Sequence, residues 1–154
     1  MPRNRRKTKG RGGDAGFGAL PRAVWEHPDY CKLSGSAVKL LMDLACQYNG
    51  RNNGDLTVAY SILKKRGWSS KDTITNAKDR LLEAGLIICT REGRFTNPGG
   101  ECALYALAWK PINDCPDRRL AVAPTNTPPR KFSLEIIKPP GPETGPGAPR
   151  KPGR

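Results

Sequence analysis

The clearest pattern of apolar and polar positions is a helical stripe over 37–48. Its apolar residues follow Ser34, a residue type that caps helices well. Lys39, Asp43 and Gln47 recur every four residues and are therefore expected on the opposite face, in water. The pattern predicts an amphipathic helix from Ser34 to about residue 48.

A second long helix is predicted over 69–84. Asp72 stands three residues after Ser69, which is the spacing of a capping box, and Gly85 is placed to end the helix. The apolar residues that recur at helical spacing, and are expected to point inward, are Ile74, Ala77, Leu81 and Ala84.

Two shorter helices are predicted before the long ones. Pro21 favours a helix over 22–30, anchored by residues 23–25, until Pro28 perturbs it. Thr57 is expected to cap a two-turn helix through Lys64, with the left-handed stop at Gly67. The residues expected to face inward from this helix are Ala59, Ile62 and Leu63. The Asn- and Gly-rich segment 48–55 predicts a tight loop, followed by a short extended stretch at 55–57.

Two β-prone runs, 86–89 and 102–109, are separated by the polar stretch 92–101. They predict a β-hairpin with a long charged tip. The residues expected to pack in the core rather than stack on bases are Trp25, Trp68, Trp109 and Tyr105, whereas His27 is expected on the surface. The resulting fold class is α+β, with one domain at 19–110.

Both ends of the chain differ in composition from this domain. Residues 1–18 are rich in Arg, Lys and Gly and predict a disordered basic arm. Residues 111–154 hold eleven of the fifteen prolines and predict a disordered Pro/Gly-rich tail. Within this tail, the apolar segment 132–137 is a candidate docking site for a protein partner.

Charge and cysteine content narrow the function classes. The net charge of +13 and the pI of about 9.9 favour a polyanionic partner, most commonly nucleic acid. The longest apolar run, 102–109, is too short to span a membrane, and no secretory signal is evident, so a cytoplasmic, nucleoid-associated protein is expected. Five cysteines without a C-x-x-C pair, one histidine and no phosphate-binding loop predict no metal, no cofactor and no enzymatic activity.

The order of predicted elements is that of a winged helix-turn-helix, with the hairpin as the wing. Thr73-Ile74 with Ala77, the run at 81–87 and the strand at 104–107 resemble the recognition helix and wing of bacterial winged-helix regulators. This resemblance implies a double-stranded DNA-binding protein.

The segments 33–41 and 47–54 are similar to a narrower group, the small uncharacterised helix-turn-helix proteins of bacterial prophages and plasmids. The resemblance covers about residues 17–110. It implies a protein of a mobile element that acts in transcriptional regulation or as a replication or origin-binding accessory, with a homodimer as one arrangement.

The helix at 69–84 is expected to enter the major groove, where its outward side chains reach base edges. The residues expected to contact bases are Ser70, Lys71, Asp72, Thr75 and Asn76. The residues expected on the DNA backbone are Thr73, Lys78, Arg80, Arg91 and Arg94 of the domain and wing 91–101, with Arg3, Arg5, Arg6, Lys7, Lys9 and Arg11 of the arm. Each of these residues has the alternative of an ordinary solvated surface position.

Two other functions remain open from the sequence. The winged helix and the Pro-rich tail can serve as a protein-interaction adaptor, and the basic arm can bind RNA as well as DNA.

Overall fold

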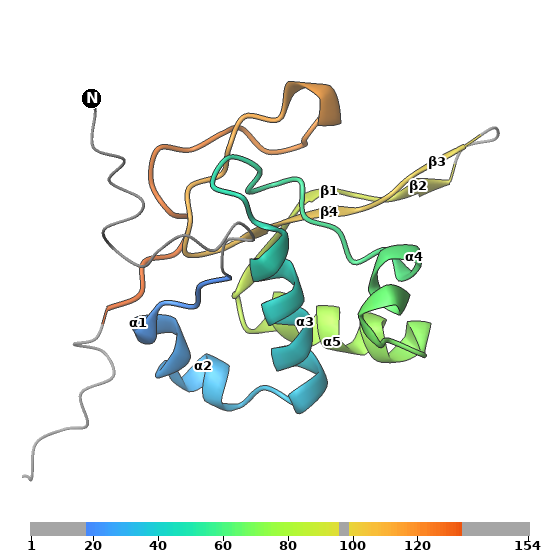
Figure 1. Ribbon diagram of the computed structural model, residues 1–154. Coiled ribbons are helices and arrows are strands. Elements are labelled where there is room, and N and C mark those ends of the chain that lie inside the picture. The colour runs from blue at the N-terminus through green and yellow to red at the C-terminus, as the bar shows by residue number, and fades with distance from the viewer. Residues whose placement is uncertain (1–17, 96–98, 134–154) are drawn as a thin grey trace, which may run out of the picture.

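The structure, a computed structural model, describes residues 18–95 and 99–133 (Figure 1). The described part is an α+β fold with five α-helices and two small antiparallel two-stranded sheets. The core lies where the two long helices meet the hairpin, and its members are mostly aliphatic. Residues 1–17 of the basic arm, 96–98 of the hairpin tip and 134–154 lie outside the described residues.

The long helices confirm the periodicity argument. α3 (Gly35–Gln47) begins at Ser34, whose Oγ accepts a hydrogen bond from Ala37 N at 3.3 Å. α5 (Lys71–Glu83) packs against α3 and buries three of the four residues expected to face inward, Ile74, Ala77 and Leu81. The fourth, Ala84, is the C-cap of α5 and is only half-buried. Its cap differs from the prediction. Ser70, not Ser69, accepts from Thr73 N, so Asp72 is not part of a capping box.

Pro28 divides the first predicted helix in two. α1 (Arg22–Trp25) and α2 (Pro28–Cys31) are single turns, because proline fits the first position of a helix but not its interior. In α1, Val24 takes the inward position, so the adjacent Trp25 turns outward and is 55% exposed. The expectation that Trp25 packs in the core is therefore wrong.

His27 is also placed differently from the prediction. Its side chain is only 12% exposed, and its Nδ1 caps α2 by accepting from Asp29 N at 3.1 Å. The ring of Phe132 meets it edge-on, with centroids 5.1 Å apart.

The third short helix is also shorter than predicted. α4 (Tyr60–Leu63) begins after Ala59 and continues as the 3-10 turn η1 (Lys64–Arg66). Leu63 is buried whereas Ile62 is 46% exposed, because a one-turn helix has room for one inward position. Gly67 has φ +88° and ends the turn in the left-handed conformation, as expected.

The hairpin is confirmed and is longer than its two main strands. β1 (Ile87–Arg91) pairs with β4 (Leu104–Leu107), and a bulge near Arg91 shifts the register. Leu56 forms an isolated antiparallel bridge to Tyr105 on the other edge of β4. β2 (Arg94–Phe95) and β3 (Gly100–Glu101) extend the hairpin beyond the helices (Figure 1).

Residues 111–133, called the strap below, were expected to be disordered, and this expectation is wrong. The part of the strap around the short 3-10 helix η2 (Pro116–Arg118) lies on the side of the hairpin opposite to α3 and α5 (Figure 1). The end of the strap instead reaches the helices, where Arg130 Nη1 donates to Ala84 O at 2.7 Å. Ile112 is 4% exposed, and Ala121 N donates to Thr90 O at 2.7 Å. Proline prevents regular structure here, but the remaining backbone groups still find partners on the domain. The folded unit therefore extends past residue 110.

Candidate nucleic-acid interface

The outward face of α5 carries the residues that the sequence predicts to contact bases. Lys71, Asp72, Thr75 and Asn76 are all exposed, while Ser70 is half-buried with its Oγ engaged in the helix cap. The Thr75 hydroxyl donates back to Lys71 O at 3.1 Å, which leaves its lone pairs outward. α5 therefore brings four of the five predicted side chains together on its exposed face, whereas the fifth, Ser70, is held in the cap.

The charge of α5 is balanced. The helix contains three basic residues, Lys71, Lys78 and Arg80, and three acidic residues, Asp72, Asp79 and Glu83. Lys78, predicted to contact the DNA backbone, is 24% exposed and pairs with Asp79 at 3.1 Å. Thr73 and Arg80, also predicted on the backbone, are exposed. With no net charge, α5 contributes little long-range attraction for a polyanion.

Hollows lie on both sides of this face. One, of about 310 Å³, lies between α5 and the hairpin and is lined by Lys71, Thr75 and Lys78 together with Tyr60 and Tyr105. The ammonium of Lys71 lies 5.4 Å from the ring centroid of Tyr60. Burial raises the pKa of Tyr105 to about 12, so its phenol stays neutral.

The second hollow is on the side of α5 that faces the start of α3. It measures about 550 Å³ and is lined by Asn76, Asp79, Arg80, Glu83, Ser34 and Ser36. Between the two hollows, the outward side chains of α5 form a ridge, which is the shape that a groove of duplex DNA accepts.

The hairpin places its two predicted arginines in different situations. Arg94 is exposed on β2, and its neighbour Phe95 is fully exposed at 105%. The guanidinium of Arg91 instead donates to Cys102 O from Nε and Nη2 and to Arg118 O from Nη1. Arg91 therefore joins the base of the hairpin to the strap, and three of its five donors are used internally.

One basic cluster was missed by the sequence reasoning. Lys64, Lys65 and Arg66 form the turn η1 directly before α5, and all three are exposed. Lys39 of α3 joins them, since its ammonium donates to Arg66 O at 3.0 Å. The signal in the sequence is three consecutive basic residues before Gly67, a pattern that is also typical of the end of a helix.

Asp43 holds this cluster in place. Predicted in water, it is 6% exposed instead and accepts from Trp68 Nε1 at 2.7 Å and from Arg66 Nε at 3.2 Å. A buried carboxylate needs such partners, because an unpaired charge in the protein interior is costly. Lys39 lies 4.9 Å from the ring centroid of Trp68 and completes the arrangement.

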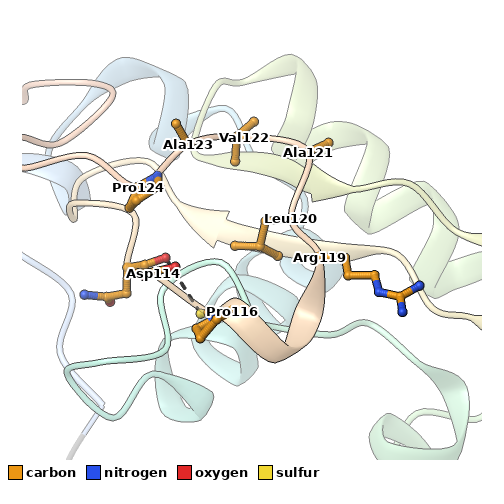
Figure 2. A pocket seen from close by; sticks show the side chains of 10 residues that line it. Asp114, Pro116, Arg119, Leu120, Ala121, Val122, Ala123 and Pro124 are labelled. Carbon is orange, nitrogen blue, oxygen red and sulfur yellow. Dashed lines mark hydrogen bonds between the residues drawn. The ribbon is translucent and has the colours of Figure 1, made fainter.

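The strap contains a further hollow, of about 360 Å³, which Figure 2 shows with the residues that line it. Burial is the largest cause that raises the pKa of the Cys115 thiol in this hollow. The side chain of Arg119 points away from the hollow (Figure 2). No predicted site residue lies here.

Several predictions concern residues outside the described part, namely the arm residues Arg3, Arg5, Arg6, Lys7, Lys9 and Arg11, and positions 134–137 of the apolar segment. Phe132 of that segment packs against His27 and the core. Within the described ranges, no group of three or more His, Cys, Asp or Glu residues is arranged to hold a metal ion. No helix there is both long and apolar enough to cross a membrane.

Comparisons with protein-family models, curated proteins and solved structures find no match for this chain.

Proposed function

We propose that the chain is a winged helix-turn-helix protein that binds double-stranded DNA sequence-specifically. The observation that carries the proposal is the outward ridge of α5 beside a hairpin that projects past the helices. α4, the turn and α5 correspond to the helix-turn-helix, Leu56 and the β1/β4 pair to the small sheet, and β2/β3 to the wing.

In this proposal α5 reads base edges and other parts of the chain supply affinity. Asn76 is suited to pair with adenine, and Lys71 to donate to guanine, each worth about 1–3 kcal/mol of discrimination. Arg94 on the wing and the basic residues outside the described ranges neutralise phosphates. The described residues carry a net charge of +6 and the others +7, so binding is expected to weaken steeply with salt.

The role in the cell that we propose is regulation of transcription, or origin binding in replication, of a bacterial mobile element. A homodimer on paired half-sites is the proposed arrangement, because helix-turn-helix modules commonly read such sites.

The test is selection of bound sequences from a pool of random duplexes with the full chain, near physiological salt. The full chain is required because the strap belongs to the folded unit. We expect an enriched motif, and we expect Asn76→Ala to lose the preference at one position. Asn126→Ala is the matched control, because Asn126 is an exposed asparagine on the strap. Binding without any enriched motif would refute sequence-specific reading by α5.

The exposed ring of Phe95 favours one alternative, a protein-contact module that uses the hairpin tip. The variant Lys71→Glu with Arg94→Glu separates the two functions. It should abolish duplex binding under the DNA proposal and leave a contact through Phe95 in place under the alternative. Arg91 is left unchanged, because its reversal would break the hydrogen bonds that join the hairpin to the strap.

A further inference from the structure

The strongest concentration of unpaired positive charge in the described residues is not on α5 but on the turn before it. Lys64 and Lys65 are exposed neighbours, and neither has an ion-pair partner among residues 18–95 and 99–133. Arg66 and Lys39 extend the cluster to four cations. Among the described residues, the carboxylate in contact with the cluster is that of Asp43, which is buried and already shared between Arg66 and Trp68.

The turn is also held in a fixed conformation. Lys39 donates to Arg66 O at 3.0 Å, and Arg66 Nη2 lies 3.1 Å from Asp43 Oδ1. Gly67 then reverses the chain with φ +88°, and Trp68 N donates to Leu63 O at 3.3 Å. Fixed cations lose less conformational entropy on meeting an anion than cations on a mobile segment.

The position of the turn relates it to the ridge of α5. Only the four residues 67–70 separate Arg66 from Lys71, the first residue of α5, and the ring of Tyr60 in α4 lies against the Lys71 ammonium. The basic turn therefore flanks the N-terminal end of the ridge. Arg94 belongs to β2 of the hairpin, a separate element, and does not line the hollow of about 310 Å³ beside that ridge.

We infer that Lys64 and Lys65 contact the phosphate backbone of the duplex whose groove receives α5, and that Asp43, Lys39 and Trp68 hold the turn in the orientation required. This inference rests on the proposed function and adds a second backbone contact, independent of the wing. The contact is electrostatic and carries no sequence information, since phosphates are identical along the duplex.

The experiment measures the affinity of the full chain for a selected duplex and for a random duplex over a range of salt concentrations. The test variant is Lys64→Ala with Lys65→Ala, and Lys64→Glu with Lys65→Glu is a stronger form. The control is Arg51→Ala with Lys131→Ala, which removes two exposed cations from the loop after α3 and from the strap. A thermal unfolding curve verifies that each variant is folded.

We expect the alanine pair to reduce the slope of log affinity against log salt by about 2, one for each phosphate contact. Selected and random duplexes should be weakened by the same factor, and the control should keep the slope of the unchanged chain. The glutamate pair should weaken binding further.

Two results would overturn the inference while leaving the proposed function in place. One is a test variant whose salt slope equals that of the unchanged chain or of the control. The other is a test variant that weakens only the selected duplex, because this would mean base reading rather than phosphate contact. A full chain that binds no duplex at low salt overturns both proposals.

Discussion

Asn53 offers the sharpest test of how this fold is held together. It is fully buried, and its side-chain amide joins the loop after α3 to the end of β4 and the start of the strap. Nδ2 lies 3.1 Å from Leu107 O, 3.1 Å from Lys110 O and 3.0 Å from Pro111 O, and Oδ1 accepts from Leu107 N at 2.7 Å.

Asn53→Ala removes all of these contacts without changing the backbone. The Leu107 N–H is left buried without its partner, which costs about 1–3 kcal/mol. The two amide hydrogens lose bonds to carbonyl oxygens, worth about 1 kcal/mol each. We therefore expect the free energy of unfolding to fall by about 3–5 kcal/mol, in urea denaturation followed by tryptophan fluorescence.

Asn53→Asp is the matched variant, because it keeps the shape and the acceptor for Leu107 N. It removes the donors and places a carboxylate against three carbonyl oxygens, so we expect a loss of stability at neutral pH at least as large as for alanine. Burial should raise the pKa of the introduced carboxyl, so this variant should regain stability as the pH falls. A loss below about 1 kcal/mol for Asn53→Ala, or a neutral Asn53→Asp, would refute the reasoning.

Three further predictions concern other parts of the fold. Gly67→Ala should lower the free energy of unfolding by about 1–2 kcal/mol, because φ is +88° at this position. The control Gly35→Ala, in open space at the start of α3, should not destabilise the protein, and equal effects of the two variants in urea denaturation would contradict the prediction. The pKa of Asp29 is lowered from its ordinary value of 3.8, and the largest cause is the hydrogen bond from Arg130. The ionised Asp29 therefore stabilises the fold above pH 3.8, and this contribution is lost as the pH falls through the lowered pKa of the folded state. The gap in unfolding free energy between the unchanged chain and Arg130→Gln should therefore narrow below pH 3.8, and a gap constant with pH would argue against this pair. A chain ended after residue 110 should unfold at a markedly lower temperature than one ended after residue 133, because it lacks Ile112 and the strap hydrogen bonds; equal melting temperatures would show that the strap adds no stability.

Elements that depend on local signals were predictable from the amino-acid sequence. Ser34 caps α3, the spacing of Ile74, Ala77 and Leu81 fixes the inward face of α5, and Gly67 supplies the left-handed stop. These features involve residues within a few positions of one another, so periodicity and capping rules are sufficient to find them. The exposure of Lys71, Thr75 and Asn76 follows from the same periodicity.

Which polar residues lie inside depends on contacts between distant segments and could not be predicted from local patterns. Asp43 occupies a polar position in its helical pattern, yet it is buried because Trp68 and Arg66 reach it from 25 and 23 residues away. Asn53 resembles an ordinary loop residue until the carbonyls near residue 110 are brought to its amide. The strap has no helical or strand pattern, and its order comes from partners distant in sequence. Such contacts leave no local signal, because hydrogen bonds between segments far apart in the chain depend on where the core brings those segments together.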